Sequence, residues 1–311
     1  MPGSSSRGWK VTAALLATVL LAGAGAAGFF LLRGEKEQDT ERSGWPGAES
    51  PPLVRETPPD LGDAFNLLVV VLGQEGSGKE IRTVADTVVL VRVDLRLKRA
   101  ACLFLPRTTY LEIAGMGKLT LAELWAPGGL ALTTAALQDV TGMLIDHHLV
   151  LRQDQLARLV DLYGEIDFTL PEAVNDPRRG SLEPGAVQLD GSGVVLVSTY
   201  GGYAGGEIGR IGIERSLLVS AAAQLHRAAS RPAFAWTVNL SAAEMDTDLA
   251  TDQLLRLARG FASWPVADLS VGTAPGESGT IGGRKKVFLL DETGLRNAVS
   301  SMLAAATVPV P

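Results

Sequence analysis

Continuous apolar runs mark the first strands of a folded region. The runs NLLVVVLG at 66–73, TVVLVRVD at 87–94 and RAACLFL at 99–105 predict strands, the first of them buried on both faces. Only the four residues LRLK join the second run to the third, which is short enough for a hairpin. At least part of the predicted sheet is therefore antiparallel.

Helical periodicity takes over after these strands. Apolar positions spaced three and four residues apart predict helices at 130–141, 154–163, 213–229, 251–261 and 295–305. Asp154 is the expected cap of the second helix and Gly164 its end. Further strands are predicted at 148–151, 165–170, 194–199 and 286–290. The mixture predicts an α/β or α+β fold, with a mixed central β-sheet flanked by helices.

The N-terminal part follows a different pattern. Residues 11–32 contain no charged side chain and as a helix would extend about 33 Å, enough to cross a bilayer. Arg7 and Lys10 precede this segment, so the positive-inside rule puts residues 1–10 in the cytoplasm. A cleaved signal peptide is the alternative, because small residues cluster at 21–28, but the apolar stretch exceeds an ordinary signal core. Residues 33–64, rich in proline, glycine and charge, predict a disordered tether.

We therefore expect a single-pass protein of the cell membrane with one extracytoplasmic domain. Residues 65–229 are the expected core of this domain, and residues 230–311 are expected to continue it. The chain of 311 residues is 46% hydrophobic, which suffices for a real core. Its net charge of -6 provides no basic surplus, so we expect no nucleic acid partner. The single cysteine, Cys102, excludes an intramolecular disulfide.

An arginine follows the third predicted strand. Pro106 cannot donate to a sheet ladder and ends the strand, so Arg107 is expected at the sheet rim beside the hydroxyl groups of Thr108, Thr109 and Tyr110. A guanidinium binds phosphate through two parallel hydrogen bonds, and ligands of open α/β sheets lie off the strand ends. The placement suggests a phosphorylated substrate, but the pattern taken alone favours the alternative, a surface arginine that follows an ordinary strand.

The segment GQEGSGKE at 73–80 resembles a nucleotide-binding P-loop. Glu80 stands where a serine or threonine would ligate magnesium, and a carboxylate there repels phosphate. We interpret the segment as a glycine-rich loop between two strands.

Charged side chains also gather near other predicted strand ends. They are Glu75, Arg82, Asp86, Arg107, Glu207 and Arg210. Two carboxylates at the ends of adjacent strands can hold Mg²⁺, which takes oxygen ligands and commonly bridges to substrate phosphates. Spacing alone does not show that these side chains converge.

The order of these segments resembles that of the LytR-CpsA-Psr proteins. The similarity extends over about residues 66–305, and its strongest stretches include ADTVVLVRVDLRLKRAACLFLPRTTYLEI, LARLVDLYGEIDFTL and GEIGRIGIERSLL. It implies a membrane-anchored bacterial enzyme that moves a glycopolymer from a polyprenyl-pyrophosphate carrier to peptidoglycan.

The resemblance also implies roles for individual residues. Asp86, Arg107 and Arg210 match the catalytic set, in which the two arginines bind pyrophosphate. Asp86 and Glu75 are the implied magnesium ligands. Glu207 and Arg82 are further residues of the pyrophosphate site, where Arg82 would compensate for an arginine that the family carries two residues before Asp86. An acidic residue is the expected general base, and the sequence does not choose between Glu75 and Glu207.

Several positions depart from the family's pattern. Val84, Thr199, Gly201 and Ile213 stand where arginine is usual, and Glu214 stands where glutamine is usual. Each lost bidentate contact to a pyrophosphate removes on the order of 1.5 to 3 kcal/mol. The alternative is therefore a catalytically impaired module that binds polyprenyl-phosphate lipids or wall polymer. A transcription regulator is disfavoured, since no basic recognition helix is present.

Overall fold

The computed structural model describes residues 61–76, 80–264, 269–282 and 285–304. The strands are β1 (Ala64–Glu75), β2 (Arg82–Asp94), β3 (Arg99–Leu105), β4 (Tyr110–Ile113), β5 (Gly117–Thr120), β6 (His147–Arg152), β7 (Ile166–Leu170), β8 (Val174–Asp176), β9 (Gly180–Leu182), β10 (Gly185–Leu189), β11 (Asp246–Thr247), β12 (Leu269–Thr273), β13 (Gly276–Ile281) and β14 (Lys285–Leu290). The helices are α2 (Trp125–Thr141), α3 (Gln153–Tyr163), α4 (Gly191–Thr199), α5 (Gly206–Ala229), α6 (Phe234–Ala242), α7 (Thr251–Ser263) and α8 (Glu292–Ala304).

The predicted cytoplasmic tail and membrane segment, and nearly all of the predicted tether, lie outside the described residues. Within the described ranges, no helix has both the length and the apolar character needed to span a membrane.

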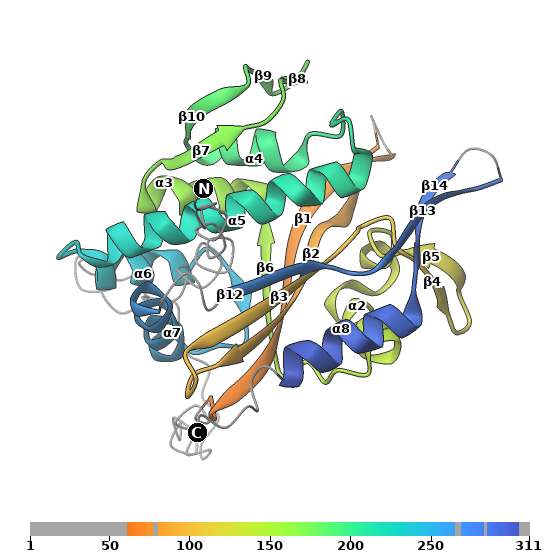
Figure 1. The fold of residues 1–311 in the computed structure, drawn as a ribbon, viewed down its shortest axis with the longest axis horizontal. Coiled ribbons are helices and arrows are strands. Elements are labelled where there is room, and N and C mark those ends of the chain that lie inside the picture. Colours follow the sequence, from red (N-terminus) through yellow and green to blue (C-terminus); the bar gives the residue numbers. More distant parts are fainter. Residues whose placement is uncertain (1–60, 77–79, 265–268, 283–284, 305–311) are drawn as a thin grey trace, which may run out of the picture.

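Six strands form the central sheet, in the order β11-β6-β1-β2-β3-β12 (Figure 1). β2 runs antiparallel to both β1 and β3, and β11 runs antiparallel to β6. β6 is parallel to β1, and β12 is parallel to β3. The predicted mixed sheet and the predicted hairpin of the second and third strands are both confirmed. The four-residue turn LRLK permits only an antiparallel pairing of β2 with β3. The long connection that includes α2 permits β6 to run parallel to β1.

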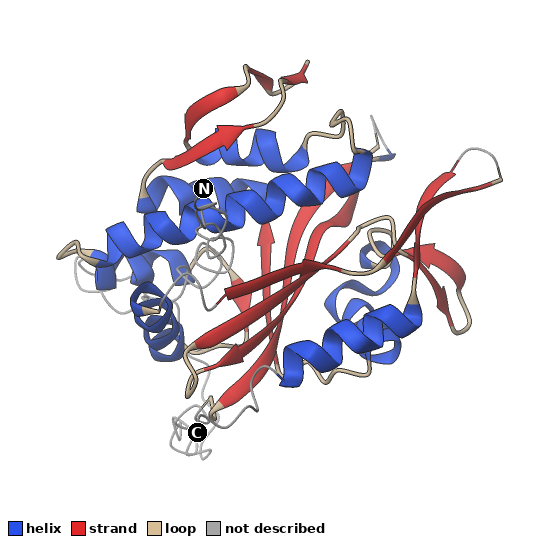
Figure 2. Cartoon of the chain, viewed as in Figure 1, coloured by secondary structure: helices blue, strands red, loops and turns tan. Residues whose placement is uncertain are grey.

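Alternation along the strands directs side chains to two faces of the sheet. In β1, Leu67 and Val69 pack with residues of α3, α5 and α7, whereas Leu68 and Val70 pack with residues of α2 and α8. Figure 2 shows these two groups of helices on opposite sides of the strands. All four side chains are buried, and each such burial contributes about 1.5 to 3 kcal/mol.

A third core cluster lies beyond α3. It joins buried side chains of α3, α4, α5 and α6 with those of β7 and β10. Gly191, the first residue of α4, lies directly against α3, where a Cβ atom would be 2.0 Å from the carbonyl oxygen of Ala157. Only glycine therefore allows α4 to pack this closely on α3.

The expected strand at 194–199 is wrong, because these residues form most of α4. The run of valine and leucine favours a strand locally. Asp190 nevertheless caps a helix, since its side chain accepts a 2.7 Å hydrogen bond from the backbone N–H of Gly193. Val194, Leu196 and Val197 are buried in the third core cluster, which explains the apolar stretch of this helix.

Helix starts also differ from expectation, most clearly those of α3 and α5, while α2 and α8 begin five and three residues earlier than expected. Arg152, not Asp154, is the N-cap residue of α3, and the Gln155 side chain accepts a 2.8 Å hydrogen bond from the Arg152 backbone N–H. The helix expected at 213–229 begins seven residues earlier, at Gly206. Glycines at 206, 209 and 212 lower the helix propensity of that first stretch, which is held instead by the polar contacts described below.

Candidate functional site

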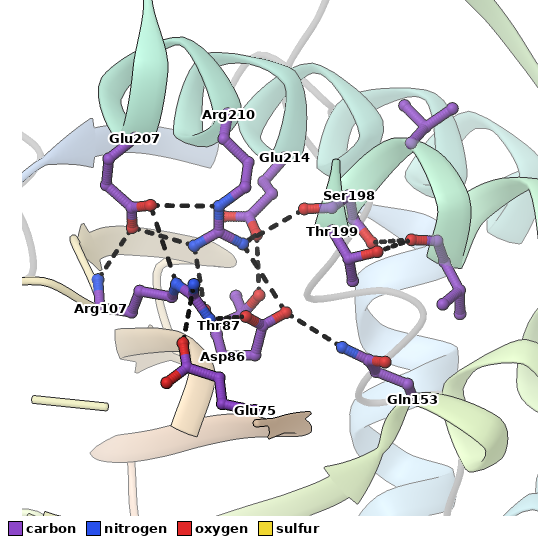
Figure 3. Close-up of polar contacts among 12 residues, drawn as sticks. Glu75, Asp86, Thr87, Arg107, Gln153, Ser198, Thr199, Glu207, Arg210 and Glu214 are labelled. Atoms are coloured by element: carbon purple, nitrogen blue, oxygen red, sulfur yellow. Dashed lines mark hydrogen bonds and ion pairs between the residues drawn. The ribbon is translucent and has the colours of Figure 1, made fainter. Parts of the chain in front are cut away.

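The candidate site lies at one edge of the central sheet, where the charged residues expected from the sequence converge (Figure 3). Because β1 and β2 are antiparallel, Glu75 at the end of β1 pairs with Arg82 at the start of β2. Arg107 follows the end of β3 at the same edge, since β3 is antiparallel to β2. The first turns of α5 bring Glu207 and Arg210 over this edge.

Arg107 lies among three carboxylates. Its Nη1 is 2.6 Å from Oδ1 of Asp86, and its Nη2 is 2.9 Å from Oε1 of Glu75. Its backbone N–H donates a 3.0 Å hydrogen bond to Oε1 of Glu207. The side chain of Arg107 remains 28% exposed, so it is not fully buried by these contacts.

Arg210 is buried, and all the N–H groups of its guanidinium donate hydrogen bonds within the protein. Its Nη1 donates to Oε1 of Glu214 at 2.8 Å and to the carbonyl oxygen of Ser198 at 3.2 Å. Its Nη2 donates to Oε1 of Glu207 at 2.9 Å and to the carbonyl oxygen of Asp86 at 3.1 Å, and its Nε donates to Oε2 of Glu207 at 3.3 Å. A guanidinium has five N–H groups, so Arg210 keeps none for a substrate in this arrangement.

The charges around Arg210 decide its protonation. Burial alone would lower the pKa of the guanidinium, but the carboxylates of Glu214, Asp86 and Glu207 outweigh burial and raise the pKa well above its usual range. Arg210 is therefore a permanent cation that links β2, α4 and α5.

Glu214 is a buried acid that the sequence did not assign to the site. Its side chain is 1% exposed, and Oε1 accepts hydrogen bonds of 2.8 Å from both Arg210 and the hydroxyl of Thr87. Burial raises the pKa of Glu214 to about 7, although Arg210 and Thr87 act in the opposite direction. Its distance of four residues from Arg210 on one helix was the available sequence signal, because such residues share a face.

A second group of polar residues lies on the other side of Asp86. Nε2 of Gln153 donates a 3.1 Å hydrogen bond to Oδ2 of Asp86. Oε1 of Gln153 accepts a 2.7 Å hydrogen bond from Nη2 of Arg179, whose Nη1 donates to the hydroxyl of Thr199. No sequence signal indicated Gln153 or Arg179, because they come from a helix start and a short turn, and neither lies within the matched stretches named above.

Two expectations about the surroundings of Arg107 are only partly met. Arg82 lies 3.9 Å from Glu75 but is more than half exposed, so it is at the rim of the site and not within it. The hydroxyls of Thr108, Thr109 and Tyr110 make no hydrogen bond with Arg107 in the described part of the chain. Thr109 is instead buried, and the Tyr110 ring lies beneath Nζ of Lys285.

The described residues contain no group of three or more histidine, cysteine, aspartate or glutamate side chains arranged to hold a metal ion. Glu75 and Asp86 both contact the Arg107 guanidinium, which lies between them. Together with Glu207 and Glu214 they make four carboxylates around the two inner guanidiniums of Arg107 and Arg210. These carboxylates supply oxygen donors of the kind that Mg²⁺ takes.

Three curated relatives match part of the chain. The probable cell wall biosynthesis protein LcpB of Corynebacterium glutamicum is 26% identical over 118 residues, which are 38% of this chain and 28% of that protein. A polyisoprenyl-teichoic acid–peptidoglycan teichoic acid transferase, TagU of Enterococcus faecalis, is 26% identical over 106 residues, which are 34% of this chain and 35% of that protein. The chain thus spans about a third of the length of the curated relatives that it matches.

A solved structure and a family model cover much more of the chain. The crystal structure of TagV from Bacillus subtilis shares 16% sequence identity and a TM-score of 0.69, covering 80% of this chain and 99% of that one, which shows a common fold. The LytR_cpsA_psr family model matches residues 35–302, which include every charged residue of the candidate site. The chain therefore belongs to the LytR_cpsA_psr family.

Proposed function

We propose that this protein is a membrane-anchored, extracytoplasmic transferase that moves a glycopolymer from a polyprenyl-pyrophosphate carrier to peptidoglycan. One observation carries the proposal: Glu75, Asp86, Arg107, Glu207 and Arg210 converge at one sheet edge. Family membership and the wall-polymer transferase activity named for TagU support the substrate class. The anchor and its orientation rest on the apolar segment at 11–32.

Magnesium is part of the proposal. Glu75 and Asp86 would hold it, because both are hard oxygen donors and Mg²⁺ commonly binds through one or two carboxylates together with water and substrate phosphates. When bound, the ion would supply positive charge to the phosphate oxygens.

The proposed reaction is a phosphoryl transfer. A hydroxyl oxygen of the wall glycan attacks the phosphorus that carries the glycopolymer and forms a new P–O bond. The bond from this phosphorus to the bridging oxygen breaks, and polyprenyl phosphate leaves with the electron pair. The hydroxyl proton passes to a carboxylate, for which Glu75 and Glu207 are the two candidates.

The two arginines have different parts in this reaction. Arg107, whose side chain is partly exposed, stabilises the charge that develops on the phosphate oxygens. Arg210 is a positioning residue, since its N–H groups hold Glu207 and the backbone of Asp86.

The test is an activity assay with the full chain in detergent, a lipid-pyrophosphate-linked glycan and peptidoglycan. We expect transfer that requires Mg²⁺, stops with EDTA and is lost in D86N. The matched control is D252N, which alters an exposed aspartate on α7, and we expect it to keep activity. A panel of donors that yields no transfer, with a family member active in parallel, would contradict the proposal.

A binding module without catalysis is the second candidate. The observation that favours it is charge: both inner arginines are neutralised by carboxylates, and Thr199 stands where the family usually has arginine. Tight, Mg²⁺-independent binding of the lipid-linked glycan without transfer would favour this candidate.

A further inference from the structure

A cleft of about 500 Å³ opens next to the candidate site. Its walls are the end of β1, the start of β2, the first turns of α3 and α4, and Arg179 from the turn between β8 and β9. Leu72, Ala157 and Val195 make part of the wall apolar. Gln153 lines the cleft and also donates to Asp86, so the cleft and the charged cluster share a boundary.

The two arginines that line the cleft differ in their partners. Arg152 is paired with Asp154, whose Oδ1 lies 3.2 Å from its Nε. The guanidinium of Arg179 donates only to the neutral side chains of Gln153 and Thr199, and it forms no ion pair with any residue that the structure describes, although the backbone N–H of Arg179 donates to Oδ1 of Asp176. The positive charge of Arg179 is therefore uncompensated at the cleft wall.

Gln153 fixes this charge in relation to the site. Its amide oxygen accepts from Arg179 and its amide nitrogen donates to Asp86, so one side chain separates the guanidinium from the carboxylate. Thr199 holds the other end of the guanidinium through its hydroxyl. A guanidinium held at two points loses little further conformational entropy when it binds an anion.

We propose that Arg179 is a substrate-binding residue that contacts the phosphate groups of a polyprenyl pyrophosphate from the cleft side of Asp86. The proposal deepens the proposed function and rests on it. The need for such a residue follows from the charges. Arg107 and Arg210 are surrounded by carboxylates, whereas a pyrophosphate requires cations that are not already paired with an acidic side chain.

The test is equilibrium binding of geranylgeranyl pyrophosphate to the full chain in detergent with Mg²⁺, measured by calorimetry at several NaCl concentrations. We expect R179Q to weaken binding about 10-fold or more and to reduce the dependence of affinity on salt. The matched control is R178Q, since Arg178 lies in the same exposed turn and its side chain makes no hydrogen bond or ion pair with the described residues. We expect R178Q to bind within about twofold of wild type, because a solvated charge contributes little.

Each contrary result is distinct. Wild-type affinity in R179Q, or an equal loss in R178Q, would overturn the role of Arg179 and leave the proposed function standing. A lower melting temperature in R179Q with an unchanged salt dependence would also overturn it, by making Arg179 a structural tether. A wild-type chain that binds no geranylgeranyl pyrophosphate would overturn this role and the proposed function together.

Discussion

Arg210 contacts Asp86 directly, Arg179 is linked to Asp86 through Gln153, and the two arginines show what burial does to one type of side chain. Arg210 is 4% exposed, and every N–H group has an acceptor. Arg179 is exposed, and its guanidinium donates only to neutral oxygens. A buried guanidinium must be paired or it is too costly to desolvate, whereas an exposed one can keep its charge for a ligand. The comparison thus distinguishes Arg210, which holds the site together, from Arg179, which is available to bind a ligand.

The largest expected effect comes from removing the buried cation. R210M leaves the buried Glu214 without its ionic partner, so we expect the free energy of unfolding to fall by about 3 to 5 kcal/mol. Urea denaturation followed by circular dichroism measures it. The matched control is R296A, which breaks an exposed pair with Glu292 and should cost no more than about 0.5 kcal/mol. A loss below about 1 kcal/mol in R210M would contradict the structural role that the comparison assigns to the buried Arg210.

The pKa of Glu214 gives a prediction for stability against pH. The folded-state pKa of about 7 lies above the usual 4.5, so the folded chain binds more protons than the unfolded chain between these values. Stability contributed by this group is therefore full below about pH 4.5 and is lost as pH rises to about 7, by on the order of 3 kcal/mol. The measurement is urea denaturation at pH 5 and pH 8.

The matched variant for this pH dependence is E214Q, which keeps the shape and removes the titration. We expect its difference in unfolding free energy between pH 5 and pH 8 to be smaller than that of wild type. Identical differences in the two proteins would assign the pH dependence to another group.

Arg107 lies between the two extremes, because it is paired and yet partly open. We expect R107Q to lower the transfer rate about 100-fold, corresponding to roughly 2.7 kcal/mol of transition-state stabilisation. We expect R107K to recover part of that loss, since lysine keeps the charge and loses the two-pronged geometry. A rate in R107Q within threefold of wild type, roughly 0.6 kcal/mol, would mean that Arg107 does not meet the substrate.

The smallest effect is expected at Arg82. Its side chain is 55% exposed, and its Nη2 is 3.9 Å from Oε2 of Glu75, which is a long distance for an ion pair. We therefore expect R82Q to change the free energy of unfolding by less than about 1 kcal/mol. We expect a decrease in the transfer rate of about threefold at most. A loss as large as that of R107Q would show that Arg82 moves into the site and would extend the comparison to a third arginine.

The sequence predicted the framework well where burial and local pattern agree. The runs that became β1, β2 and β3 are apolar on both faces, and both faces of the sheet are covered by helices. The run at 194–199 was equally apolar but became α4, because its cap at Asp190 and its place between other helices outweigh the strand preference of valine.

The candidate site was predictable only in its motif residues. Asp86, Arg107 and Arg210 belong to recognisable stretches, and the structure brings them together with Glu75 and Glu207. Gln153 and Arg179 were missed because their contacts depend on how the turn between β8 and β9 lies over α3 and α4. Such proximity is a property of tertiary packing, and neither residue carries a local signal of it.

The glycine at the start of α4 has a consequence for substrate size. α3 and α4 form two walls of the cleft, and their separation is limited by the contact between Gly191 and the carbonyl oxygen of Ala157. Any side chain at position 191 would force the two walls apart and carry Thr199, which holds Arg179, away from Asp86. The absence of a Cβ atom at Gly191 thus helps to determine how wide a molecule this cleft can accept.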